Sequence, residues 1–166
     1  RRLVDVLDLH WYPEARGGGV RVTEANNGAE VAAARVQAPR SLWDPAYAEN
    51  SWISVDARVG AIRLLPRLRE KIAARDPGTR LAITEYNLGG DTGISRALAQ
   101  AEALAIFGRE GVELATRWVA PQHGTRVQDA FRLYLDFDGA GSRVEGFSVR
   151  ALSSSVDRVG AYAVDD

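Results

Sequence analysis

The segment from Leu81 to Gly90, LAITEYNLGG, places the strongest constraint on how this chain can fold. Its first four residues are apolar or β-branched, and turn-forming residues flank the segment on both sides, which is typical of a short buried strand. Glu85 therefore stands where a buried strand emerges. In α/β sheets and barrels, ligands bind at the carboxyl ends of the strands. Position alone leaves two interpretations open: a catalytic glutamate, or one held by a buried arginine or a backbone amide.

Composition argues against several classes of function. The chain has 166 residues, a net charge of −1, no cysteine and two histidines. Such a chain has no basic field for a phosphate backbone, so we expect no nucleic-acid binding. We also expect no thiolate or multi-histidine metal site, and no membrane span because no run of about 18 apolar residues occurs. Methionine is absent as well. We therefore expect a piece of a longer protein, for which the lack of a signal peptide says nothing about secretion.

A second strand is predicted from Leu3 to Tyr12, where polar and apolar residues alternate. One face carries polar side chains and the other apolar ones, namely Asp8, His10 and Tyr12 against Leu7, Leu9 and Trp11. Taken singly, His10 and Tyr12 fit a structural role better. As a pair on one face at the end of a strand, they indicate contact with a substrate.

The other hydrophobic patterns predict helices that alternate with strands. Helices are predicted at 30–37, 58–75, 94–110 and 128–135. We expect Asp56 to cap the second of these helices, and Pro66 either to kink it or to divide it into two abutting helices. Strands are predicted at 20–23 and 112–119, and an antiparallel hairpin at 147–154 and 158–164.

This order of elements indicates an α/β fold built of β/α units. Three units with long loops after the strands are consistent with part of a (β/α)8 barrel, which needs roughly 250 residues. A small doubly wound sheet is the alternative. It is disfavoured because no glycine-rich phosphate loop follows any strand.

Two tryptophans, Trp43 and Trp52, lie in the long irregular region between the first strand and the helix at 58–75. Loops of this length are uncommon unless they are functional. Either the tryptophans pack against the core and so anchor the loop, or they offer flat surfaces on which sugar rings stack. Trp118 stands at the end of the strand predicted at 112–119.

Several longer motifs converge on one family. They are DLHWYPEA (8–15), VQAPRSLWDPAY (36–47), LAITEYNLGG (81–90) and AQAEALAIFGREGV (99–112), with AFRLYLDFDGAG, SVRAL and VGAYAV in the tail. Together they resemble glycoside hydrolase family 44, the endoglucanase and xyloglucanase family. The resemblance implies a partial TIM barrel, about strands six to eight with their helices, over residues 1–136. It also implies that residues 137–166 begin a flanking β-sandwich.

The resemblance further implies a retaining mechanism with Glu85 as the nucleophile. His10 and Tyr12 would end strand six, and one or the other would hold Glu85 by hydrogen bonding. Trp118 would lie under the sugar at the cleavage point. Other candidate sugar contacts are Tyr86, Trp43 and Trp52. The general acid would come from strand four, upstream of this chain, so we expect the isolated chain to have little or no activity.

The expected activity is endo-hydrolysis of β-1,4-glucan chains such as cellulose, carboxymethylcellulose or xyloglucan, and of xylan in some members. No catalytic cofactor is implied, whereas a structural calcium ion in the full-length protein is compatible with the family. An extracellular location is implied, with β-glucan and the missing N-terminal half of the barrel as partners. Two alternatives remain: another retaining barrel glycosidase, such as a xylanase or mannanase, and a non-catalytic carbohydrate-binding module.

Overall fold

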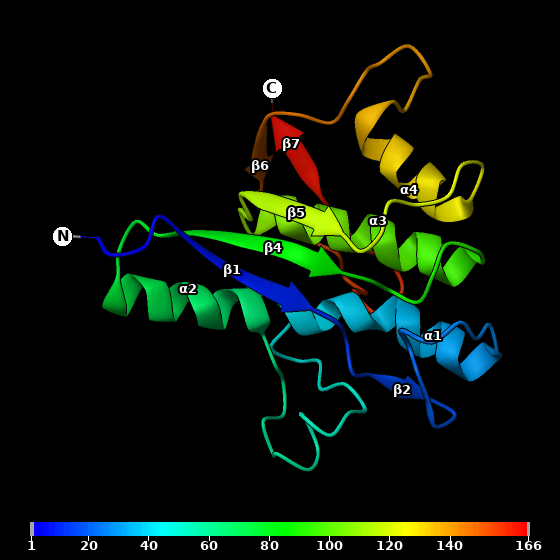
Figure 1. Ribbon diagram of the computed structural model, residues 1–166, viewed down its shortest axis with the longest axis horizontal. Helices are drawn as coiled ribbons and strands as arrows, with labels where there is room; N and C mark the ends of the chain where they lie inside the picture. Colours follow the sequence, from blue (N-terminus) through cyan, green and yellow to red (C-terminus); the bar gives the residue numbers. More distant parts are fainter. Residues whose placement is uncertain (1, 166) are drawn as a thin grey trace.

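The computed structural model describes residues 2–165 and shows a mixed α/β architecture built on a parallel sheet. The sheet has three strands in the order β1 (Val6–Trp11), β4 (Arg80–Tyr86) and β5 (Leu114–Arg117). Parallel neighbours need crossover connections, and helices supply them here. All three strands point the same way, so their carboxyl ends lie at the same end of the sheet (Figure 1).

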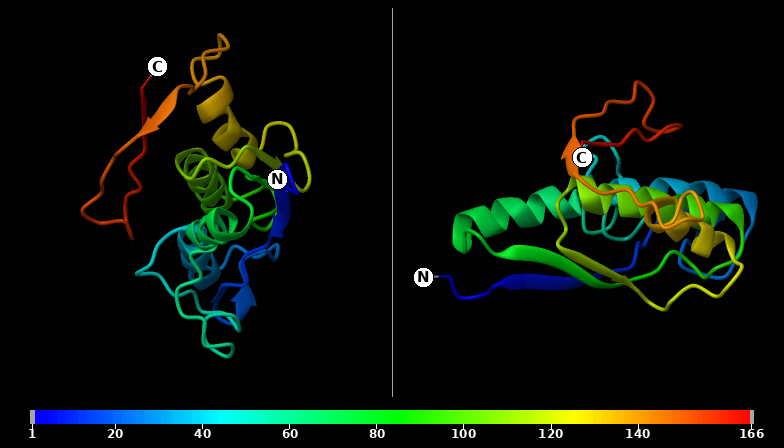
Figure 2. Two further views of the ribbon diagram at one scale, coloured as in Figure 1. Left: turned by 90° about the vertical axis from the view of Figure 1, so that its left-hand side faces the viewer. Right: turned by 90° about the horizontal axis from the view of Figure 1, so that it is seen from above.

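Helices cover only one face of this sheet. The helices α1 (Ala29–Gln37), α2 (Leu64–Arg75) and α3 (Ile94–Arg109) lie behind the strands, as the view from above in Figure 2 shows. The short 3-10 helix η1 (Ala38–Leu42) extends α1, and α4 (Arg126–Leu135) packs against α3. Within residues 2–165 no helix lies on the other face, which we call the open face.

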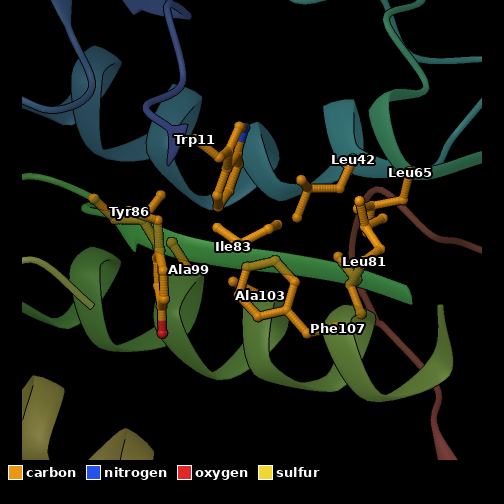
Figure 3. Packing of buried hydrophobic residues seen from close by; sticks show 11 residues of the cluster. Trp11, Leu42, Leu65, Leu81, Ile83, Tyr86, Ala99, Ala103 and Phe107 are labelled. Atoms are coloured by element: carbon orange, nitrogen blue, oxygen red, sulfur yellow. The ribbon is translucent and has the colours of Figure 1, made fainter. Parts of the chain in front are cut away.

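The core lies between the sheet and the helices (Figure 3). Trp11, Tyr86 and Phe107 form an aromatic cluster, with ring centroids 5.2 Å apart for Tyr86 and Phe107 and 6.1 Å for Trp11 and Phe107. Both of these pairs meet edge to face, the arrangement that the ring quadrupoles favour. Aliphatic and small side chains from β4, η1, α2 and α3 fill the space around the cluster, namely Leu81, Ile83, Leu42, Leu65, Ala99 and Ala103.

The second predicted helix is shorter than the hydrophobic pattern suggested. It begins at Leu64, and both Arg58 and Arg63 have left-handed backbone angles, with φ of 55° and 48°. Such angles do not occur inside a right-handed helix, so the prediction of a helix from residue 58 with Asp56 as its cap was wrong. Pro66 consequently falls in the first turn of α2. A missing N–H costs nothing there, and the proline produces no kink.

The predicted strands are also shorter in the structure. Of the strand predicted at 112–119, only β5 forms, and of the strand predicted at 20–23, only β3 (Val20–Arg21) forms. The strand β3 pairs antiparallel with β2 (Arg16–Gly17). Near the C-terminus, β6 (Phe147–Val149) and β7 (Ala163–Asp165) pair antiparallel, as predicted. Irregular chain joins them, so the long hairpin strands were overestimated. None of the helices in the described part of the chain is long and apolar enough to cross a lipid bilayer.

Candidate active site at the strand ends

Glu85, His10 and Tyr12 meet at the carboxyl ends of β1 and β4. The Tyr12 hydroxyl donates a hydrogen bond of 2.5 Å to Oε1 of Glu85, and Nδ1 of His10 lies 3.7 Å from Oε2. The Glu85 side chain is 26% exposed, so it is partly shielded and still reachable from the open face. The expected contact between Tyr12 and the Glu85 carboxylate is therefore present.

A β-bulge decides which way Glu85 points. Leu9 pairs with Ile83, but the next pair is His10 with Glu85, so Thr84 is the extra residue on β4. In a regular strand side chains alternate, which would turn Glu85 toward the helices because Ile83 already faces them. The extra residue shifts this alternation. Glu85 turns to the open face beside His10, and Tyr86 turns into the core beside Trp11.

Tyr12 is held in its protonated form. Burial, together with the hydrogen bond to Glu85 and the negative charge of that carboxylate, raises the pKa of Tyr12 to about 12. The phenol thus stays a hydrogen-bond donor throughout the neutral pH range. It can orient one oxygen of Glu85 while leaving the other oxygen free for chemistry.

The loop after Glu85 fixes the backbone of Trp118. The Trp118 N–H donates to the carbonyl oxygen of Tyr86 at 2.9 Å, and the Asn87 side-chain amide donates to the carbonyl oxygen of Trp118. The Asn87 side-chain oxygen accepts from the backbone amides of Gly89 and Gly90 at 2.7 and 3.1 Å. The indole of Trp118, whose peptide bond to the next residue is cis, is 57% exposed. The chain therefore presents a large aromatic surface close to the end of β4.

An ion pair reinforces the same junction. Nη2 of Arg117 lies 2.6 Å from Oδ1 of Asp91, and it also donates to the carbonyl oxygen of Gly90 at 3.0 Å. The other oxygen of Asp91 accepts from the backbone amide of Gln122 at 2.9 Å. Both side chains of the pair are largely buried. The loop after β4 and the segment after β5 are thereby tied together on both sides of Trp118.

Three of the predicted sugar contacts have surroundings that differ from one another. Tyr86 is fully buried, and its hydroxyl accepts a hydrogen bond of 2.7 Å from Gln100, so it belongs to the core and its assignment as a sugar contact is corrected. Trp43 packs against the core with Arg109 stacked 4.0 Å from its ring. It lines a cavity of about 460 Å³ between α3 and the C-terminal segment. Trp52 is 57% exposed in the long loop before α2.

Other residues contribute to the geometry although the sequence patterns did not single them out. Thr84, Asn87, Asp91 and Arg117 all hold the strand ends through hydrogen bonds or ion pairing. The sequence offered one indication of their role, namely that Thr84 and Asn87 stand directly before and after Glu85–Tyr86. A β-bulge and a contact between two loops do not change the hydrophobic periodicity, so the pattern could not reveal them. The alternation of polar and apolar residues places Asp8 on the same face as His10, but it does not reveal that Thr84 is its hydrogen-bond partner.

Two further carboxylates near the site, Asp8 and Glu14, do not suit the role of a general acid. A hydrogen bond from the Thr84 side chain lowers the pKa of Asp8, whereas an acid catalyst needs a raised one. Glu14 forms an ion pair with Arg21. Across residues 2–165, no group of three or more histidine, aspartate or glutamate side chains gathers where it could hold a metal ion.

Comparison with known proteins identifies proteins that are similar to this chain in sequence. No family model matches the chain. The chain is 45% identical over 164 residues to endoglucanase A of Paenibacillus lautus, an alignment that covers 98% of this chain and 23% of that protein. It is 43% identical over 176 residues to beta-mannanase/endoglucanase A of Caldicellulosiruptor saccharolyticus, covering 98% of this chain and 13% of that protein. The chain thus spans less than a quarter of the length of these curated relatives.

Solved structures agree with the sequence comparison. A glycoside hydrolase family 44 endoglucanase produced by Clostridium acetobutylium superposes with a TM-score of 0.92 at 44% identity, over 99% of this chain and 32% of that one. A family 44 xyloglucanase of Paenibacillus polymyxa gives 0.89 at 40% identity, over 99% and 33%. In sequence and in fold, this chain is therefore similar to a segment of the glycoside hydrolase family 44 enzymes, about a third of the length of these solved chains.

Proposed function

We propose that this chain belongs to the catalytic domain of a retaining endo-β-1,4-glucanase that cleaves glucan chains such as carboxymethylcellulose or xyloglucan. One observation carries the proposal. Glu85 lies at a strand end, partly exposed and hydrogen bonded by Tyr12, in a chain whose structural neighbours are named endoglucanases and xyloglucanases. An extracellular location follows from the same resemblance, since polymeric glucan is found outside the cell.

The architecture proposed for residues 1–136 is the last part of a (β/α)8 barrel. In it, β1, β4 and β5 are strands six, seven and eight. Their parallel order and the helices on a single face support this arrangement, because barrel strands carry helices outside and side chains inside. The open face then becomes the barrel interior. Residues 137–166, with the β6–β7 pair, begin the flanking β-sandwich.

Glu85 acts as the nucleophile in this mechanism. Its carboxylate attacks the anomeric carbon while a general acid protonates the departing glycosidic oxygen, which leaves a covalent glycosyl-enzyme. The residue that had served as the acid then takes a proton from a water molecule. This water attacks the same carbon and releases Glu85. Tyr12 orients the carboxylate, and His10 lies close enough to contact the sugar or the second carboxylate oxygen. These carboxyl groups carry the chemistry without a cofactor.

The general acid comes from the segment that completes the barrel. In a retaining enzyme its carboxyl lies about 5–5.5 Å from the nucleophile. Asp8 is unsuited because its pKa is lowered, and Glu14 is engaged with Arg21. The N-terminal half of the barrel is therefore a partner that catalysis requires. The chain on its own is expected to turn over no glucan, and a structural calcium ion in the complete enzyme stays a prediction.

Sugar contacts are proposed for exposed aromatic surfaces near the site. Trp118 is the first candidate, because the loop that follows Glu85 holds its backbone and its indole is exposed. The C–H faces of a glucosyl ring would pack on that surface. Trp52 is a second candidate, exposed on the long loop. Trp43 is the weakest, since its ring stacks with Arg109 against the core.

The polysaccharide could also be a different β-1,4-linked chain. One relative is named a beta-mannanase/endoglucanase, and one neighbour with a TM-score of 0.86 is described as a bifunctional glucanase-xylanase. Product analysis on xyloglucan, carboxymethylcellulose, xylan and mannan with the complete enzyme separates these substrates. A non-catalytic carbohydrate-binding module is the alternative from another class, and it predicts that Glu85 is dispensable.

The experiment that tests the proposal compares Glu85, near the end of β4, with Glu14, which follows the neighbouring strand β1. In the complete enzyme, Glu85→Gln is expected to abolish hydrolysis of soluble xyloglucan and carboxymethylcellulose. Glu14→Gln is the matched control, because it removes a carboxylate that is paired with Arg21 and should leave turnover nearly unchanged. Full turnover in Glu85→Gln would overturn the assignment of the nucleophile.

A further inference from the structure

The bulge that turns Glu85 toward the open face is held by side chains from both neighbouring strands. On β1, Oδ1 of Asp8 accepts two hydrogen bonds from Thr84, at 3.1 Å from the backbone amide and 2.6 Å from the hydroxyl. On β5, the Thr116 hydroxyl donates to the carbonyl oxygen of Thr84. Each polar group of the bulged residue is thus bonded to an adjacent strand.

These contacts replace the backbone pairing that the bulge removes. A bulged residue is left out of the ladder, and its amide and carbonyl need other partners. The neighbouring pairs are Leu9 with Ile83 and His10 with Glu85, so Thr84 has no opposite residue on β1. The Thr84 hydrogen bond also lowers the pKa of Asp8, so the acceptor is ionised at neutral pH and is a strong one.

We infer that Asp8, Thr84 and Thr116 are positioning residues that fix the direction in which Glu85 presents its carboxylate. This inference rests on the proposed function, in which Glu85 attacks the anomeric carbon. None of the three side chains has to touch the sugar, because they act through the backbone of β4. Without them the strand could return to regular alternation, which would turn Glu85 toward the helices.

Kinetics of the complete enzyme on soluble xyloglucan test the inference. Thr84→Val keeps the shape of the side chain but removes the hydroxyl donor, and Asp8→Ala removes the acceptor. Each is expected to lower kcat by about tenfold or more, because a misplacement of about 1 Å can cost on the order of 10²-fold in rate. The KM for xyloglucan should stay close to the wild-type value, since the substrate contacts are unchanged.

Conservative variants supply the rescue. Thr84→Ser retains the hydroxyl, and Asp8→Asn retains the side-chain oxygen that accepts both hydrogen bonds. Both are expected to keep kcat within a few-fold of wild type. If Thr84→Val does not fold, the comparison of Asp8→Ala with Asp8→Asn carries the test.

Thr79→Val is the matched control for general weakening of the sheet. The Thr79 hydroxyl donates to the carbonyl oxygen of Val4 at 2.7 Å, which links the same two strand segments at the opposite end from Glu85. Its kcat should equal that of wild type. A similar loss in Thr79→Val and Thr84→Val would overturn the inference, because weaker strand pairing would then explain both.

The remaining outcomes separate the inference from the function on which it rests. Wild-type kcat in folded Thr84→Val and Asp8→Ala, beside an inactive Glu85→Gln, would overturn the positioning role alone. An effect confined to KM would also overturn it, since that indicates direct contact with substrate. Full activity in Glu85→Gln would overturn the proposed function, and the inference with it.

Discussion

The hydroxyl of Tyr12 donates a hydrogen bond of 2.5 Å to Oε1 of Glu85 and joins the segment that follows β1 to the end of β4. A hydrogen bond to an ionised group is stronger than one between neutral partners. It holds one carboxylate oxygen in place while the carboxylate remains reachable. The predictions below follow from this contact and from the packing that supports it.

Removal of the Tyr12 hydroxyl is expected to slow catalysis. Hydrogen bonds to charged groups contribute about 1.5–3 kcal/mol, which corresponds to a loss of about 10–100-fold in kcat for Tyr12→Phe if the contact is kept in the transition state. Tyr47→Phe is the control, because the Tyr47 ring packs against Arg40 and lies outside the site. Steady-state kinetics on xyloglucan measure both variants, and equal kcat values would contradict a role for the Tyr12 hydroxyl.

The tyrosines should resist ionisation in the folded protein. The pKa values of Tyr12, Tyr47 and Tyr86 are raised to about 12, mainly by burial, and those of Tyr134 and Tyr162 are also raised. These are all five tyrosines of the chain. An unfolded tyrosine has a pKa of about 10. Near pH 11 the folded chain should therefore show far less phenolate absorbance than the same chain in urea.

The same shift sets the direction of a pH effect on stability. Between about pH 10 and 12 the folded state holds more tyrosine protons than the unfolded state, so the stabilising contribution is complete below pH 10 and is lost as the pH rises toward 12. Glu85→Gln should lower the pKa of Tyr12, because it removes a neighbouring charge. Tyr12-specific NMR titration measures this change, and an unaltered Tyr12 pKa would contradict the contact.

Removing one partner of the buried ion pair between Arg117 and Asp91 should lower the free energy of unfolding more than removing one partner of an exposed pair of equal length. Asp91→Ala leaves a guanidinium that is 97% covered without its partner and is expected to cost about 3–5 kcal/mol of unfolding free energy. Arg80 and Glu113 are also 2.6 Å apart but about half exposed. Glu113→Ala should cost less than about 1 kcal/mol. Urea unfolding compares the two, and similar losses would contradict the assignment.

The exposed tryptophans should differ in their effect on activity. Trp118 and Trp52 are both 57% exposed, but only the Trp118 backbone is bonded to the loop that follows Glu85. Trp118→Ala is expected to lower kcat/KM by about tenfold or more, in line with the contribution of about 1.5–3 kcal/mol from a buried aromatic side chain. Trp52→Ala should have a smaller effect. The reverse order, measured on xyloglucan, would move the main sugar surface to the long loop.

Much of the fold could be predicted because it follows from local periodicity. The strand at Leu81 and the helix at Ile94 have patterns of the right period and clear stops, and the structure places β4 and α3 there. The predicted start of a helix at residue 58 was wrong. Apolar residues recur there at helical spacing, but the backbone at Arg58 and Arg63 is left-handed. Tertiary context sets such angles, and a single sequence does not reveal them.

The candidate site could be predicted only in part. Glu85, His10 and Tyr12 are residues whose chemistry and position on a strand are visible in the sequence, and the structure brings them together. Tyr86 was misplaced because simple alternation cannot anticipate a bulge at Thr84, which sends Tyr86 into the core. Contacts between loops, such as Asn87 with Trp118, connect positions far apart in the chain and leave no local signal.

The most direct test of the central claim is the product that the complete enzyme forms when Glu85 is replaced by alanine and azide is supplied. Azide would then attack from the face that the carboxylate had occupied. With an aryl β-cello-oligosaccharide that needs little acid assistance, the account predicts an α-glycosyl azide and turnover that increases with azide concentration. A β-glycosyl azide would assign Glu85 to the general acid, and unimpaired hydrolysis without azide would show that Glu85 is structural.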